Sequence, residues 1–129
     1  MRLKKVLFVD DEPNILAAFA RQLRRDAEVI TACGPELGLA ALTSGHDFCV
    51  VVVDMQMPGM DGIEFLHRVE AAQPNAVRLM LTGNADAETA ERVIAEVGVF
   101  RFLRKPCSAA ELLQAINEAA AKYAETVAA

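Results

Sequence analysis

The stretch VVVVDMQMPGMD, residues 50–61, decides how the rest of the chain is interpreted. Four consecutive valines are β-branched and apolar, which predicts a short strand buried on both faces. That strand runs directly into Asp54, and Pro58 and Gly59 then turn the chain. Open α/β sheets place their sites at the carboxyl ends of strands, where a side chain is rigidly held. Asp54 is therefore a candidate reactive residue.

The bulk composition restricts the class of protein. The chain has 129 residues, 53% hydrophobic and 24% charged, which predicts one folded domain over residues 1–129. A net charge of −5 disfavours direct binding to nucleic acid or to an anionic membrane. No apolar run approaches the roughly 20 residues of a membrane span, and no signal-peptide pattern is present. The three cysteines have no metal-ligand spacing, so a cytoplasmic location is expected.

Short apolar runs alternate with helical patterns along the chain. Runs typical of strands cover residues 6–9, 28–31, 49–53, 76–81 and 99–103. Helical spacing of apolar residues follows each run, over about residues 13–23, 37–42, 61–69, 86–97 and 108–123. This alternation predicts an α/β fold with a doubly wound, five-stranded parallel sheet and helices on both faces. Right-handed crossovers leave a few strand orders, and alternation alone does not choose among them.

Four strand ends carry complementary polar side chains. The first strand ends in Asp10 and Asp11, the third in Asp54 and the fourth in Thr82, while Lys105 follows the fifth. In a parallel sheet these ends share one edge, so the side chains can converge. Two like charges about 4 Å apart repel by roughly 4 kcal/mol at an effective dielectric of about 20, and one lysine cannot neutralise three acids. A divalent cation such as Mg²⁺ would neutralise them. A metal, a lysine and a hydroxyl around one carboxylate predict a phosphoryl-transfer site.

Each of these residues also has an ordinary structural explanation when taken alone. An acid after a strand is usually a helix cap or a turn residue, and we interpret Asp61 and Asp86 in that way. Thr82 alone could be a turn residue and Lys105 alone a solvated charge. The combination of four strand ends is what favours a functional site. Both histidines lie away from this edge and are expected on the surface.

Together these residues resemble the receiver domain of bacterial two-component response regulators. Four motifs carry the similarity: FVDDEP at residues 8–13, VDMQMPGMDG at 53–62, LTG at 81–83 and KP at 105–106. As a set they are a specific signature that covers residues 4 to about 123. The resemblance implies a flavodoxin-like, three-layer sandwich with strand order 2-1-3-4-5.

The resemblance also implies roles for the residues around Asp54. Asp54 would accept the phosphoryl group, Lys105 would pair with the phosphoryl oxygens, and the Thr82 hydroxyl would move to meet them. Phe102 sits where the family has an aromatic switch residue, although it could be an ordinary core aromatic. The Lys105–Pro106 peptide would be cis, a form that proline makes accessible.

A metal site and a control of phosphate lifetime are implied by the same resemblance. Mg²⁺, with Mn²⁺ as the alternative, would bind Asp10, Asp11, Asp54 and the backbone carbonyl of Gln56. Gln56 and Asn84 occupy the positions that flank the path of the attacking water. Neither side chain is a general base at neutral pH, so fast built-in hydrolysis of the phosphorylated form is not expected.

The implied function is signalling rather than enzymatic turnover. A phosphohistidine of a sensor kinase or of a histidine phosphotransfer protein would donate to Asp54. The surface of the fourth helix, fifth strand and fifth helix would then change and control an output domain or partner, with a phosphorylation-dependent homodimer as one outcome. Residues 81–86 and 100–103 are similar to receivers attached to cyclic-di-nucleotide phosphodiesterase or kinase-like outputs. The last helix could lead to such a domain.

Three other functions are compatible with parts of this pattern. A phosphohydrolase of the haloacid-dehalogenase type would carry an Asp-x-Asp motif after the first strand, whereas this chain has adjacent aspartates. A flavodoxin would carry a Ser/Thr-rich phosphate loop there. A receiver that binds partners without phosphorylation is disfavoured by the complete set of site residues.

Overall fold

The sheet is parallel, with the strand order β2-β1-β3-β4-β5. The computed structural model describes residues 4–55, 57–83, 95 and 98–128. Both the predicted fold class and the strand order implied by the resemblance are confirmed. The strands are β1 (Lys4–Asp10), β2 (Ala27–Cys33), β3 (Val50–Asp54), β4 (Val77–Thr82) and β5 (Arg101–Arg104).

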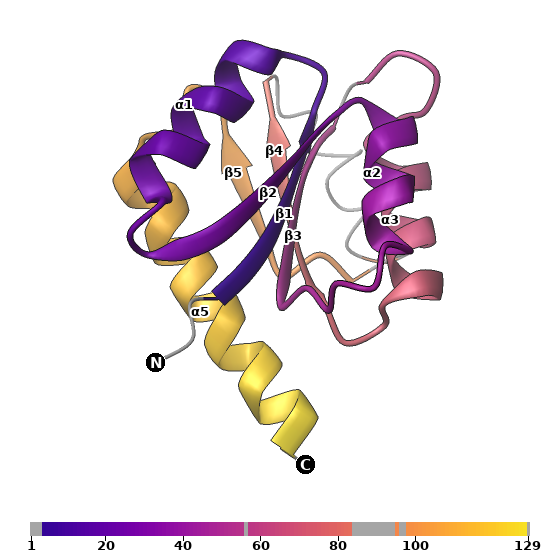
Figure 1. Cartoon of the computed structure of the whole chain (residues 1–129), viewed down its shortest axis with the longest axis vertical. Helices are drawn as coiled ribbons and strands as arrows, with labels where there is room; N and C mark the ends of the chain where they lie inside the picture. The colour runs from indigo at the N-terminus through magenta and orange to yellow at the C-terminus, as the bar shows by residue number, and fades with distance from the viewer. Residues whose placement is uncertain (1–3, 56, 84–94, 96–97, 129) are drawn as a thin grey trace.

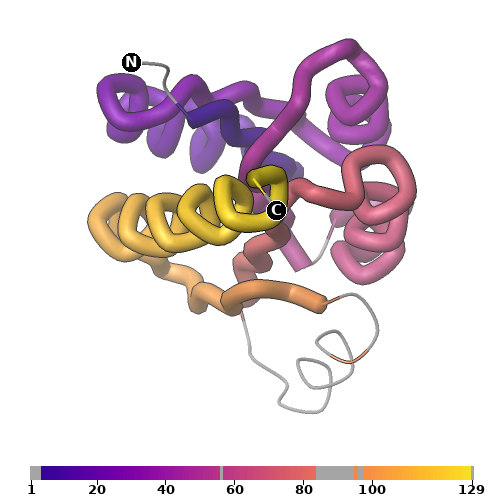
Figure 2. Tube along the Cα trace, turned by 90° about the horizontal axis from the view of Figure 1, so that it is seen from below, coloured from indigo at the N-terminus to yellow at the C-terminus, as the bar shows by residue number. Residues whose placement is uncertain are grey.

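Helices cover both faces of this sheet (Figure 1). The described helices are α1 (Pro13–Leu23), α2 (Pro35–Leu42), α3 (Gly62–Ala72) and α5 (Ala109–Ala128). In Figure 2, α1 and α5 lie on one side of the strands and α2 and α3 on the other. The helix predicted over residues 86–97 falls almost entirely outside the described residues. None of the described helices is long and apolar enough to cross a membrane.

The four valines of β3 link the two halves of the core. Val50 and Val52 pack in the cluster that holds the apolar face of α5, while Val51 and Val53 pack in the cluster of α2 and α3. All four are fully buried, as the β-branched run predicts. Complete burial of such a side chain stabilises the fold by about 1.5–3 kcal/mol. The central strand is thereby fixed from both sides, and so is the residue at its end.

Capping residues define where two of the helices begin. The Asp61 carboxylate accepts a hydrogen bond of 2.8 Å from the Glu64 backbone N–H, at the start of α3. The Ser108 hydroxyl accepts one of 3.1 Å from the Glu111 N–H, at the start of α5. Both caps satisfy N–H groups that the first helical turn leaves without partners. The interpretation of Asp61 as a cap is confirmed, whereas Asp86 lies outside the described residues.

A glutamine side chain holds the loop before β3, at the amino ends of the strands. The Gln73 amide nitrogen donates to the Leu42 carbonyl (2.9 Å) and the His46 carbonyl (2.8 Å). Its oxygen accepts from the Phe48 N–H at 2.8 Å. His46 is half-buried rather than on the surface as predicted, because its Nδ1 lies 3.1 Å from the Lys5 ammonium and its ring contacts Phe48. The other histidine is exposed on α3, as predicted.

Candidate functional site

Three buried polar residues end neighbouring strands at one edge of the sheet. Asp10, Asp54 and Thr82 are the last residues of β1, β3 and β4. Their exposed fractions are 0%, 5% and 6%. Lys105 directly follows β5. The four residues therefore lie at the same edge of the sheet, as the parallel strands predict, and the apolar strand interiors beneath this edge hold them in place.

Lys105 links two of the acids. Its Nζ lies 3.3 Å from an Asp10 carboxylate oxygen and 3.3 Å from an Asp54 carboxylate oxygen. Burial lowers the pKa of Lys105, but the charges of Asp10 and Asp54, together with their hydrogen bonds, outweigh burial and raise that pKa above its ordinary value. The ammonium is therefore charged at neutral pH. It offers a fixed positive group beside the Asp54 carboxylate.

An acidic cluster lies next to this ion pair. One carboxylate oxygen from each of Asp10, Asp11 and Glu12 lies within 4.8 Å of the others. The Glu12 backbone N–H donates to the Asp10 carboxylate at 3.0 Å, which orients that carboxylate. Oxygen ligands of this kind suit Mg²⁺ or Mn²⁺. The donor set thus fits a hard divalent cation, and it includes Glu12, which the sequence prediction did not assign to the site.

The turn after Asp54 requires a glycine at position 62. The Gly62 N–H donates to the Met55 carbonyl at 2.8 Å, and the Met55 N–H donates to the Leu81 carbonyl at 2.9 Å. A Cβ at position 62 would lie 2.8 Å from the Asp54 carbonyl oxygen and 2.9 Å from the Met55 Cα. Both atoms belong to the backbone and cannot move aside. The start of α3 can therefore approach the end of β3 only without a side chain at position 62.

The remaining predicted residues have different outcomes. The Lys105–Pro106 peptide is cis, and the Lys105 N–H donates to the Thr82 carbonyl at 2.9 Å. Phe102 is half-buried on β5 and packs against the core cluster that faces α2 and α3. This contact suits an ordinary core aromatic and a switch residue alike. Gln56 and Asn84 lie outside the described residues, so their roles stay predictions.

This combination defines a class: a doubly wound α/β domain with a lysine-linked acidic site at the carboxyl edge of its sheet. The family model of the response regulator receiver domain matches residues 6–117, and the chain belongs to this family. Receiver domains are signalling domains of response regulators.

The similar proteins have names of different kinds. The hydrogenase transcriptional regulatory protein HoxA of Bradyrhizobium diazoefficiens is 30% identical over 118 residues, covering 92% of this chain and 24% of HoxA. This chain thus spans about a quarter of that relative's length. An adenylate cyclase structure from Rhodopirellula baltica is 39% identical, with a TM-score of 0.92 and coverage of 98% and 93%. The receiver of an HD domain-containing protein from Pseudomonas fluorescens is 28% identical, with a TM-score of 0.88 and the same coverage.

Proposed function

We propose that Asp54 accepts a phosphoryl group from a phosphohistidine of a sensor kinase or histidine phosphotransfer protein. The observation that carries this proposal is the Lys105 ammonium, 3.3 Å from the carboxylates of both Asp10 and Asp54. An isolated carboxylate at the end of a strand has many structural uses. A buried carboxylate beside a fixed cation and an acidic cluster has the groups that phosphoryl transfer needs.

The proposed step forms one bond and breaks one bond. A carboxylate oxygen of Asp54 bonds to phosphorus as the P–N bond to the donor histidine breaks. The electron pair of that bond stays on the imidazole nitrogen, which takes up a proton, and Asp54 becomes an acyl phosphate. Lys105 exchanges its contact with the Asp54 oxygen for contacts with the phosphoryl oxygens. Because the strand end is rigid, Asp54 presents its oxygen without reorganisation.

Asp10, Asp11 and Glu12 offer carboxylate oxygens close enough together to hold Mg²⁺ or Mn²⁺. When bound, such an ion neutralises negative charge on phosphoryl oxygens. Without it, the three acids would repel an incoming phosphoryl group, since Lys105 supplies one positive charge. The further ligands implied by the family resemblance, the Asp54 carboxylate and the Gln56 carbonyl, stay predictions.

Phosphorylation would act through residues beside the site. The Thr82 hydroxyl, at the end of β4, would bind the new phosphoryl oxygens. A ligand shifts a conformational equilibrium only by contacts that differ between two states, and Thr82 and Lys105 would supply those contacts. Phe102 and the surface of β5, α5 and the helix predicted at 86–97 would then change. This surface would bind the output domain, a partner protein or a second copy of the chain.

The names of the similar proteins indicate outputs of different kinds. The similar proteins include a transcriptional regulatory protein, an adenylate cyclase and an HD domain-containing protein. These names differ in kind, so they support a receiver joined to some effector without selecting one. The cyclic-di-nucleotide and kinase-like outputs and the cytoplasmic location stay predictions.

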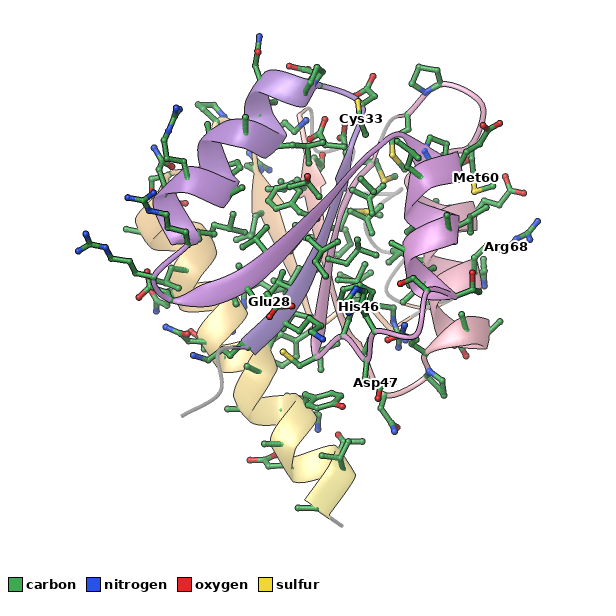
Figure 3. The ribbon with its side chains drawn as sticks, viewed as in Figure 1. Glu28, Cys33, His46, Asp47, Met60 and Arg68 are labelled. Atoms are coloured by element: carbon green, nitrogen blue, oxygen red, sulfur yellow. The ribbon has the colours of Figure 1, made fainter. Side chains whose placement is uncertain are left out.

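Replacement of Asp54 tests the proposal directly. The wild-type chain, incubated with acetyl phosphate and Mg²⁺, should gain the mass of one phosphoryl group. Asp54→Asn should gain none, because an amide is a far weaker nucleophile than a carboxylate. Asp47→Asn is the matched control, since Asp47 is an exposed aspartate toward the opposite end of the molecule (Figure 3). Circular dichroism should show that both variants are folded.

Two results would contradict this assignment. Labelling of folded Asp54→Asn at the wild-type rate would place the acceptor elsewhere. A wild-type chain that never gains a phosphoryl group, with acetyl phosphate or with a phosphorylated histidine donor, would favour a receiver that binds its partners without phosphorylation.

A further inference from the structure

The outer face of α2 carries little polar surface. Glu36 is the only polar side chain in this helix, whose sequence is PELGLAAL. Gly38 and Leu42 are buried, whereas Ala40 is exposed and Leu37 has an exposed fraction of 58%. The neighbouring helix α3 instead presents charged side chains on its exposed face. Because a helix that is apolar all round is normally buried all round, the outer face of α2 is a candidate binding surface.

A hollow of about 410 Å³ continues from this face. Pro35 and Leu37 line it from α2, while Pro58 and Met60 line it from the turn after Asp54. Met60 lies beside α2 in Figure 3. Each of the two lining segments contains a proline, which restricts the backbone on both sides of the hollow. A hollow with restricted walls loses little conformational entropy when a ligand enters it.

The rim of this hollow is acidic. Glu36 is the one charged side chain among its described lining residues. Cys33 also lines the hollow, and its Sγ lies 3.6 Å from the carbonyl oxygen of Asp11, which belongs to the acidic cluster at the carboxyl edge. No lysine or arginine lines the hollow within the described part of the chain. Apolar walls with an acidic rim complement an apolar side chain that has basic neighbours.

A second copy of this chain complements the hollow less well. A symmetric dimer pairs the same patch on both copies, so each Glu36 would approach the equivalent glutamate of the other copy. Each copy also carries a net charge of −5. Like charges brought together at an interface disfavour binding. A different protein that presents basic groups avoids this repulsion.

We propose that the α2 surface, formed by Pro35, Glu36, Leu37, Pro58 and Met60, binds a basic, amphipathic segment of a partner protein. An apolar side chain of that segment enters the hollow, and its lysines or arginines face Glu36 and the neighbouring acids. An apolar anchor in a pocket with a polar rim is the usual source of binding energy at protein interfaces. The contact does not depend on phosphorylation, so its test uses no phosphodonor.

The test is an NMR titration of the full chain labelled with ¹⁵N, in the presence of Mg²⁺. Three synthetic helical peptides are the probes: one of leucine and lysine, one of leucine and glutamate, and one of alanine and lysine. The backbone amides of Gly34, Leu37, Gly59 and Met60 report on the α2 surface, and that of Lys105 reports separately on the acidic site.

Saturable shifts of the α2-surface amides with the leucine–lysine peptide support the proposal. Its affinity should be about tenfold higher than that of either other peptide, because only it supplies both the apolar anchor and the positive charge. Equal affinity for the leucine–glutamate peptide would overturn the charge complementarity, and equal affinity for the alanine–lysine peptide would overturn the apolar anchor. Shifts confined to the Lys105 amide would overturn the proposal as a whole.

Three variants connect the shifts to the α2 surface. Leu37→Gln keeps a good helix former and removes the apolar contact, so affinity for the leucine–lysine peptide should fall about tenfold. Glu36→Gln removes an exposed charge and should weaken binding by about threefold, the scale of one exposed ion pair. Val127→Gln is the matched control, since Val127 is an apolar residue of α5 with an exposed fraction of 48%, and it should bind like the wild type.

Unchanged affinity in folded Leu37→Gln would overturn the proposal. If circular dichroism shows that Leu37→Gln does not fold, Glu36→Gln decides: weaker binding, with Val127→Gln unchanged, supports the α2 surface, and unchanged binding overturns it. Sedimentation of the chain alone tests the other occupant. A wild-type dimer that Glu36→Lys or Leu37→Gln converts to a monomer would show that a second copy covers this surface, which overturns the proposal, whereas a wild-type monomer supports it.

Discussion

The two edges of the sheet treat polar groups in opposite ways. At the amino edge, the neutral Gln73 amide makes three hydrogen bonds with backbone groups at the end of α2 and in the loop before β3. At the carboxyl edge, Asp10, Asp11 and Glu12 crowd together, and Lys105 bridges Asp10 and Asp54. At the amino edge, the Gln73 side chain therefore supplies hydrogen-bond partners for backbone groups of the loop. The second edge retains an excess of negative charge that a bound ligand can neutralise.

Lys105→Met should produce the largest change at the carboxyl edge. Removing a preorganised charge from a transfer site typically lowers the rate about 10²–10³-fold. We expect a loss of that size in the initial rate of labelling by acetyl phosphate, followed by mass spectrometry. Lys5→Met, at the amino edge, should label at the wild-type rate. A folded Lys105→Met variant that labels within threefold of wild type would show that the lysine does not stabilise the transfer.

Gln73→Leu should give the reverse pattern, with a loss of stability and no loss of chemistry. Three hydrogen bonds at about 1 kcal/mol each predict a decrease of roughly 2–4 kcal/mol in the free energy of unfolding. Urea denaturation measures this decrease, and labelling of the folded fraction should be unchanged. Gln114→Leu, on the exposed surface of α5, should alter stability by less than about 0.5 kcal/mol. If both variants lower the free energy of unfolding equally, the Gln73 hydrogen bonds do not stabilise the loop before β3 as proposed.

Substituting alanine for one glycine at each edge adds a single methyl group, so the effects at the two edges can be compared. Gly62→Ala forces a Cβ against the Asp54 carbonyl and should cost about 1–3 kcal/mol while slowing labelling, because the end of β3 must shift. Gly45, at the amino edge, has φ +96 and open space around its Cβ position. Gly45→Ala should cost about 1 kcal/mol from backbone conformation alone and leave labelling unchanged. Labelling of Gly62→Ala at the wild-type rate would show that the geometry of the turn after Asp54 does not affect phosphorylation.

The smallest effect appears only at high pH. The folded-state pKa of Lys105 is raised above the ordinary value of 10.5, so the charged lysine contributes stability that is fully present below that value. This contribution is lost as pH rises through the folded-state pKa. The difference in unfolding free energy between wild type and Lys105→Met should therefore be constant from pH 7 to 9 and shrink above 10.5. Loss of the difference between pH 7 and 9 would contradict the ion pairs seen here.

Much of the site could be predicted because buried parallel strands leave a plain signal. Residues 50–53 are apolar at every position, and the first polar residue after them, Asp54, is where the strand ends. The same reasoning located Asp10 and Thr82. The alternation of elements did not determine the strand order, because several doubly wound orders satisfy the same connection rules. The order came from the family resemblance, and the structure confirms it.

Other features depend on contacts between distant segments. Gln73 was not singled out, because its partners Leu42 and His46 are 31 and 27 positions away. Arg78 lies in a strand that its apolar neighbours predict correctly, and nothing local indicates that its buried Nε and Nη1 atoms have no hydrogen-bond partner. Glu12 had a usable signal, since it directly follows the paired aspartates. It was not assigned to the metal site because the ligand roles implied by the family resemblance fall on Asp10, Asp11, Asp54 and the Gln56 carbonyl.

The ion pair between Asp10 and Lys105 joins positions 95 residues apart. A chain in which β5 has not yet added to the sheet lacks Lys105 at the acidic edge, although Asp10 and Asp54 can already be adjacent through β1 and β3. The complete set of charges at this edge therefore exists only when the first, third and last strands of the sheet are all in place.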